Sequence, residues 1–176
     1  MKKKFGVVWV ILLVVIDQLT KIWAKSALQG KDAIDIIKGV FSLEYLENTG
    51  IAFGLFKDKF IFFVLLTLVI LAVLGFVYYK LPDTKRFRPM QFCIILIAAG
   101  AIGNMIDRVV YNYVIDFLYF NLIDFPIFNV ADIYVSVTVF VLFFLCLFYY
   151  KEDELDFITA KKTQKSKKTA GIEDRK

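Results

Sequence analysis

Long uncharged runs of apolar residues are the dominant pattern along the chain. Phe60–Tyr79 is twenty residues without a charge, and Val130–Tyr150 is interrupted only by Asp132. Pro89–Ile106 is a third apolar run, which begins at a proline and ends in small and polar residues. Because about 20 apolar residues are needed to cross a bilayer as a helix, each run predicts a transmembrane helix.

The N-terminal run is shorter and admits two interpretations. Phe5–Ile16 is only twelve residues long, so it reaches spanning length only if Asp17 and Lys21 lie inside the helix. Three lysines followed by a short apolar core are also typical of a secretory signal peptide. The polar segment after Ile16 is a poor end for such a peptide, so we favour an uncleaved first span. The four predicted spans cover about 5–25, 60–79, 89–106 and 130–150.

The segments between the spans are not simple connectors. Apolar and polar residues alternate from Phe41 to Tyr45, which predicts a half-buried strand, and Asn48–Gly50 supplies a turn. We therefore expect a small β-cradle at about 33–56. Residues 111–128 are rich in aromatic side chains, which is typical of a segment lying in the membrane interface.

The composition agrees with a membrane protein and narrows its chemistry. Hydrophobic residues make up 59% of the chain, 19 residues are Phe, and His is absent. A chain without His cannot use Ser-His-Asp catalysis or a His-ligated zinc site. Cys93 and Cys146 both lie within apolar runs, so neither a disulfide framework nor a metal cluster is expected. The predicted fold class is mainly α and integral to the membrane, with four transmembrane helices and a small outward-facing β-cradle.

The distribution of Lys and Arg predicts the orientation in the membrane. These residues are concentrated at 2–4, 80–88 and 151–176, beside the ends of the apolar runs. Since basic residues favour the cytoplasmic side, both termini are expected inside, and the segments 26–59 and 107–129 outside. Residues 1–150 then form one four-helix domain, followed by a polar, Lys-rich cytoplasmic tail at 151–176. The net charge of +5 follows this topology and does not indicate nucleic-acid binding.

Ionisable and amide side chains gather at the outward ends of the predicted spans. Each charge within a span costs roughly 2.5–3.5 kcal/mol on insertion scales, so such residues are functional candidates. Asp17 and Lys21 are spaced for an ion pair on one helix face, and Asp107 has Arg108 as a plausible partner. The full set comprises Asp17, Lys21, Asn104, Asp107, Arg108, Asp116, Asn129 and Asp132.

Asp116 and Asp132 differ from the other carboxylates because neither has a cation nearby in the sequence. Two carboxylates in a poorly hydrated site share one proton, so that one activates water while the other polarises the scissile carbonyl. Such a dyad needs neither His nor a metal. The helix N-terminus favours ionised Asp132, which makes it a candidate for the base.

Other functions remain open on this reasoning. Membrane carboxylates also mark ion pathways, so a small ion- or proton-coupled transporter is the main alternative, although the charges cluster at one face. A non-catalytic scaffold explains the apolar bulk but not the polar cluster. A Ser-Lys enzyme would have to use one of Ser26, Ser42, Ser136 and Ser166.

Five short motifs occur in an order that resembles bacterial lipoprotein signal peptidase, also called signal peptidase II. They are DQLTK at 17–21, NTGIAFG at 48–54, GNMIDR at 103–108, VIDF at 114–117 and FNVAD at 128–132. The resemblance extends from about Phe5 to Tyr150. It implies an aspartic endopeptidase of the bacterial cytoplasmic membrane that removes signal peptides from prolipoproteins, just before a diacylglyceryl-modified cysteine. It also implies inhibition by globomycin-type peptides, and neither a metal nor another cofactor.

The resemblance assigns a role to each motif residue. Asp116 and Asp132 are the implied catalytic dyad, with an active site towards the outer leaflet. The implied supporting residues are Asn104, Arg108 and Asn129 in the pocket, Asn48 and Gly50 in the cradle, and Asp17, Lys21 and Asp107 as structural polar groups. Ile51 and Ala99 depart from the family pattern, at positions where small residues or glycine are common.

Overall fold

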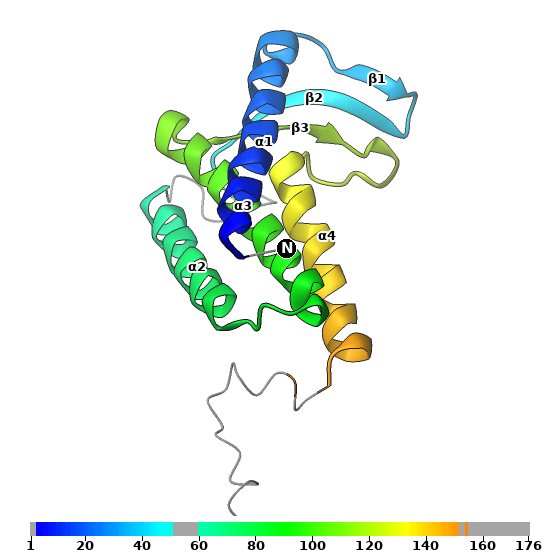
Figure 1. Ribbon diagram of the computed structural model, residues 1–176. Coiled ribbons are helices and arrows are strands. Elements are labelled where there is room, and N and C mark those ends of the chain that lie inside the picture. The colour runs from blue at the N-terminus through cyan, green and yellow to red at the C-terminus, as the bar shows by residue number, and fades with distance from the viewer. Residues whose placement is uncertain (1–2, 51–59, 152–153, 155–176) are drawn as a thin grey trace, which may run out of the picture.

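A computed structural model describes residues 3–50, 60–151 and 154 of the chain (Figure 1). Within these residues, four helices are long and apolar enough to cross a membrane. The predicted mainly helical membrane fold is therefore confirmed. The helices are α1 (Gly6–Leu28), α2 (Phe60–Lys80), α3 (Arg88–Tyr111) and α4 (Val130–Phe144), and α4 continues as a π-helical turn at Leu145–Tyr149.

Two helices extend past their apolar runs. α1 continues through Asp17 and Lys21, both buried, and ends at Leu28. α3 ends at Tyr111, five residues beyond the predicted span 89–106, so it includes Asp107 and Arg108. The polar residues continue these helices because they find partners inside the protein and do not face lipid.

The β-cradle is a three-stranded antiparallel sheet in the order β1 (Ile34–Ile37), β2 (Phe41–Asn48) and β3 (Val114–Tyr119). The predicted strand at Phe41–Tyr45 lies within β2. The last part of the cradle segment, residues 51–56, and most of the tail lie outside the described residues.

β3 is an element that the sequence pattern did not predict. Its first four residues, Val114–Phe117, are all buried, so the strand lacks the alternation of a half-exposed strand. In the sheet register Leu46 pairs with Asp116 and Asn48 pairs with Val114. The end of β2 therefore lies beside Asp116.

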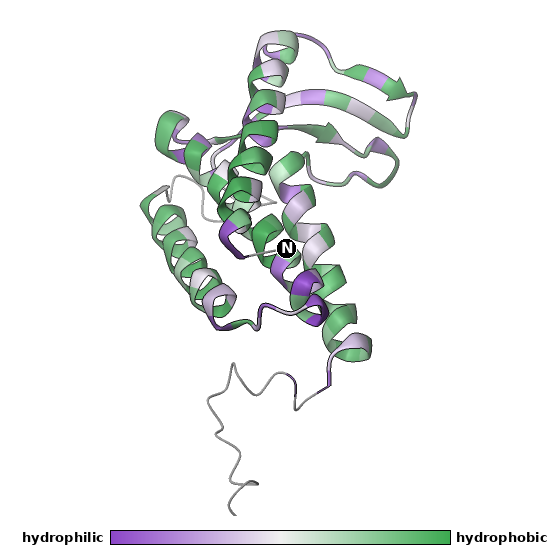
Figure 2. Cartoon of the chain, in the orientation of Figure 1, coloured by the Kyte–Doolittle hydropathy of each residue, from purple (hydrophilic) through white to green (hydrophobic). Residues whose placement is uncertain are grey.

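The sheet covers one end of the helix bundle, beside the C-terminal end of α1 and the N-terminal end of α4 (Figure 1). A buried cluster of Ala24, Leu28, Ile115 and Phe117 joins α1 to β3. At the opposite end, the α2–α3 connection is strongly hydrophilic (Figure 2). The apolar parts of the helices thus lie between two ends of the bundle. One end is covered by the sheet, and the other carries the basic α2–α3 connection (Figure 1).

Small residues bring α3 close to its neighbours. A Cβ at Gly100 would lie 2.5 Å from the carbonyl oxygen of Ala131 on α4, and one at Gly103 would meet the Asp17 carboxylate on α1. Ala99, next to Gly100, is fully buried. Three helices can therefore place their polar side chains in one compact cluster at the sheet-covered end.

Candidate active site

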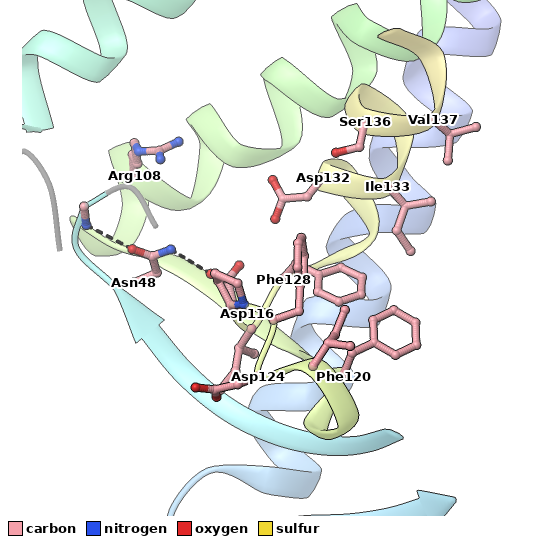
Figure 3. Close-up of a pocket in the computed structure, with 15 residues that line it drawn as sticks. Asn48, Arg108, Asp116, Phe120, Asp124, Phe128, Asp132, Ile133, Ser136 and Val137 are labelled. Atoms are coloured by element: carbon pink, nitrogen blue, oxygen red, sulfur yellow. Dashed lines mark hydrogen bonds between the residues drawn. The ribbon is translucent and has the colours of Figure 1, made fainter. Parts of the chain in front are cut away.

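A cavity of about 720 Å³ opens between the sheet, the segment after β3 and the first turns of α4. Asp116 and Asp132 both line it, from β3 and α4 respectively (Figure 3). Its polar lining includes Asn48, Gly50 and Arg108, and its apolar lining includes Phe120, Ile123, Phe125, Ile127, Phe128, Ile133 and Val137.

Asp132 is held by the way α4 begins. Asn129 is the N-cap of α4, and its side-chain oxygen accepts a hydrogen bond from the Asp132 amide at 3.0 Å. In return, Asp132 Oδ2 accepts from the Asn129 amide at 3.1 Å, which completes a capping box. Asp132 Oδ1 accepts from Asn104 Nδ2 of α3 at 2.8 Å. Two donors thus bind the Asp132 carboxylate, while the Asn129 side chain holds the backbone amide of the same residue.

Asp116 is buried in β3 and accepts hydrogen bonds from two asparagines. Asn48 Nδ2 donates to Oδ2 at 2.8 Å, and Asn129 Nδ2 donates to Oδ1 at 2.6 Å. Asn129 therefore contacts both aspartates, through its backbone to Asp132 and through its side chain to Asp116. Asn129 thus links Asp116 and Asp132, the two carboxylates that have no cation nearby in the sequence.

The environment of Asp116 favours its protonated form. Burial, together with the negative charge of Asp132, raises the pKa of the Asp116 carboxyl to about 7. The hydrogen bonds from Asn48 and Asn129 act in the opposite direction, because they stabilise the carboxylate. A carboxyl of this kind can carry a proton near neutral pH.

Asn48 and Gly50 form the rim of the cavity beside Asp116. The Gly50 amide donates to Asn48 Oδ1 at 3.0 Å, which forms the turn that the sequence predicts at this point (Figure 3). The turn leaves Asn48 Nδ2 free to reach Asp116.

Arg108 lines the cavity from α3 on the same side as this turn (Figure 3), and it does not pair with Asp107 as the sequence suggested. Its Nη1 donates to the Asn104 carbonyl at 3.3 Å, and its guanidinium lies 4.8 Å from the centre of the Phe63 ring. The expected Asp107–Arg108 ion pair is wrong because neighbours in a helix point in different directions. Arg108 instead presents positive charge to the cavity.

Asp107 pairs with Lys21, whose ammonium lies 2.9 Å from Asp107 Oδ2 and 3.0 Å from Asp17 Oδ2. The predicted Asp17–Lys21 pair is therefore confirmed, as part of a buried triad. Gln18, which the sequence analysis did not single out, donates to both carboxylates, at 3.2 Å to Asp17 and 2.9 Å to Asp107. Its only sequence signal is its position inside the first motif.

The serine alternative has little support in this arrangement. Ser136 lines the cavity, but the buried Lys21 that could activate it is bound to Asp17, Asp107 and Asn104. Ser42 donates to Asn121 and does not line the cavity, and Ser166 lies outside the described residues. Among the described residues, no group of three His, Cys, Asp or Glu side chains could hold a metal ion.

Comparison with known proteins relates the chain to one family. A family model described as "Signal peptidase (SPase) II" matches residues 9–148. The chain is 41% identical over 150 residues to a lipoprotein signal peptidase of Clostridium tetani, covering 84% of this chain and 93% of the relative. It is 43% identical over 142 residues to the Clostridium novyi protein of the same description, covering 77% and 93% of the two chains.

Two solved structures have a similar fold. Both are described as bacterial membrane enzymes studied by the in meso method, at 2.3 Å and 1.9 Å resolution. The first has a TM-score of 0.72 and 33% identity, and covers 85% of this chain and 93% of its own. The second has a TM-score of 0.71 and 32% identity, with coverage of 84% and 95%.

Proposed function

The chain belongs to the signal peptidase II family, and we propose that it cleaves diacylglyceryl-modified prolipoproteins with Asp116 and Asp132 as the catalytic pair. Membership supports lipoprotein signal-peptide cleavage, and the four apolar helices make the chain a multi-pass membrane protein. The observation that carries the two-aspartate proposal is the bridging by Asn129, which contacts both carboxylates at the cavity.

In the proposed reaction the two carboxyls share one proton. Asp132, at the N-terminus of α4 and bonded to two donors, is the proposed base that takes a proton from water. The water oxygen attacks the carbonyl carbon of the residue before the lipidated cysteine. Protonated Asp116 donates a hydrogen bond to the carbonyl oxygen, which becomes negative. The C–N bond then breaks, and the proton held by Asp132 passes to the leaving amine. In a coupled pair, the titration belongs to the dyad as a whole.

The two walls of the cavity suit the two parts of such a substrate. Asn48, Gly50 and Arg108 line the polar side and can bind the extended peptide backbone around the scissile bond. Ile133 and Val137 on α4 line the apolar side, together with the aromatic segment after β3 (Figure 3). The diacylglyceryl chains can remain in lipid along this side while the scissile bond reaches the aspartates.

The proposed location is the bacterial cytoplasmic membrane, with both termini in the cytoplasm and the active site towards the outer leaflet. The positive-inside rule supports this orientation, because the basic residues at 80–88 lie at the end of the bundle opposite the sheet. Prolipoproteins and membrane lipid are the proposed partners. Globomycin-type peptides are proposed to bind the same cavity as the substrate.

The substrate proposal is tested with purified protein and one prolipoprotein in two forms, with and without the diacylglyceryl group. We expect cleavage of the modified form just before its cysteine, little cleavage of the unmodified form, and no effect of a metal chelator. Equal cleavage of both forms would contradict the proposed substrate class. Absence of cleavage together with proton-coupled ion flux in proteoliposomes would favour the transporter alternative.

The activity is expected to fall as pH rises above about 7. Because the pKa of Asp116 is raised to about 7, its carboxyl is protonated below this value and loses its proton above it. Loss of the proton removes the hydrogen-bond donor to the carbonyl oxygen, so kcat/KM should decrease by about tenfold per pH unit on the alkaline side. Initial rates from pH 5.5 to 9, with thermal unfolding measured at each pH as a control, check this. A rate that rises steadily to pH 9 would contradict the assignment.

A further inference from the structure

The two carboxylates of the buried triad make equivalent contacts with the two segments that carry the catalytic pair. Asp17 Oδ1 accepts a hydrogen bond at 2.9 Å from the amide of Ala131, the residue before Asp132. Asp107 Oδ2 accepts one at 3.1 Å from the amide of Ile115, the residue before Asp116. In each case, the residue directly before the catalytic aspartate has its backbone amide held by one carboxylate of the triad.

Lys21 holds these two carboxylates at a defined separation. Its ammonium contacts Asp17 and Asp107 at 3.0 and 2.9 Å, and all three side chains are buried. Because the triad joins α1 to α3, and its carboxylates bind backbone amides of α4 and β3, it connects four elements around the dyad. The positions of the β3 and α4 backbones therefore depend on one lysine.

The third contact of Lys21 reaches the dyad through a side chain. Lys21 Nζ donates to Asn104 Oδ1 at 2.8 Å. Since an ammonium group can only donate, this contact requires the Asn104 oxygen to face Lys21. The amide nitrogen of Asn104 then faces away and donates to Asp132 at 2.8 Å. Lys21 thus fixes which end of the Asn104 amide meets the dyad.

We propose that Asp17, Lys21 and Asp107 are positioning residues that set the relative placement of Asp116 and Asp132. The inference rests on the proposed function and deepens it. The carboxylate oxygens of the triad accept hydrogen bonds from backbone amides of β3 and α4, in addition to balancing the charge of Lys21. An error of about 1 Å in the placement of catalytic groups can reduce a rate by about 100-fold, so the effect should be found in kcat.

The test compares two substitutions of Asp107. Asp107→Asn keeps one acceptor oxygen for the Ile115 amide and loses the one that accepts from Gln18. Asp107→Ala leaves the Ile115 amide without this acceptor. We expect kcat of the Asn variant to remain within about tenfold of wild type and kcat of the Ala variant to fall about 100-fold. For both variants, KM should stay within about threefold of wild type, because the substrate-binding wall is not changed.

Lys25→Met is the matched control for removal of a polar contact between α1 and the residue before β3. Lys25 lies one turn after Lys21 and donates to Tyr113 at 3.1 Å, just before β3, without contacting the triad or the dyad. We expect its kcat to stay within about threefold of wild type, because a half-exposed polar contact contributes little.

Several outcomes would overturn the inference. Equal kcat values for Asp107→Asn and Asp107→Ala would show that the acceptor oxygen does not matter, and losses confined to KM would show that the triad does not place the catalytic groups. If Asp107→Ala does not fold, a folded Asp107→Asn variant with kcat as low as that of Asp116→Asn overturns it as well.

The failure of this inference is distinguishable from the failure of the proposed function. If wild type cleaves, Asp116→Asn and Asp132→Asn do not, and Asp107→Ala keeps wild-type kcat, only the inference is wrong. If wild type does not cleave the modified prolipoprotein, both are wrong.

Discussion

Replacement of Asp116 or Asp132 by asparagine is expected to lower kcat for prolipoprotein cleavage by about 10³-fold or more, with little change in thermal unfolding. Asparagine keeps the shape of aspartate but can neither take a proton from water nor share one with its partner. General acid and base catalysis each contribute about 10²–10⁴-fold, and both depend on the pair. Because the two residues act as a unit, the double variant should be little slower than either single variant. Initial rates for the three variants measure this.

Asp124→Asn is the matched control for these substitutions. Asp124 is a third carboxylate at the cavity wall, where it accepts a hydrogen bond at 2.6 Å from the Tyr119 hydroxyl. It makes no contact with Asn129, Asn104 or Asn48, so we expect its rate to stay within about threefold of wild type. A folded Asp116→Asn or Asp132→Asn variant as active as this control would disprove the two-aspartate assignment.

Lys21→Met is expected to cause the largest loss of stability. The substitution leaves the buried carboxylates of Asp17 and Asp107 without their shared cation. Removal of one partner from a buried ion pair costs about 3–5 kcal/mol, because the remaining charge is desolvated and unpaired. The measurement is the free energy of unfolding in mixed micelles, followed by the fluorescence of Trp23, whose ring packs against Phe117 of β3.

Two further variants separate this effect from general damage to α1. Lys25→Met removes a half-exposed cation from the same helix, including its contact at 4.2 Å with the Tyr111 ring, and should cost about 1 kcal/mol or less. The neutral triple variant Asp17→Asn/Lys21→Met/Asp107→Asn should recover much of the stability, since no unpaired charge remains. A Lys21→Met protein as stable as Lys25→Met would contradict the triad as described.

The sequence predicted the helices because lipid is the solvent around them. An apolar run such as Phe60–Tyr79 needs no partner within the protein, so its length and composition are sufficient. The Asp17–Lys21 pair could also be predicted from the sequence, because a spacing of four residues on a helix brings the two side chains together. These features depend on local spacing alone.

Features that depend on contacts between elements were not predicted. β3 has buried residues on both faces, so its sequence lacks the alternation that identifies a strand. Asp107 was assigned to its neighbour Arg108, whereas its cation comes from α1, 86 positions earlier in the chain at Lys21. The bridge from Asn129 to Asp116 likewise requires the β3 and α4 segments to meet. The motif resemblance pointed to these residues without indicating their contacts.

The most direct test of the central claim is mass spectrometry of a cleavage reaction in ¹⁸O-water, with wild type, Asp116→Asn and Asp132→Asn compared side by side. If the two aspartates activate water directly, wild type releases a signal peptide carrying one ¹⁸O in its new carboxylate, acid-quenched enzyme keeps its unmodified mass, and both variants release almost no product. A covalent peptide adduct on the quenched enzyme, or a variant that cleaves at the wild-type rate, would contradict the account.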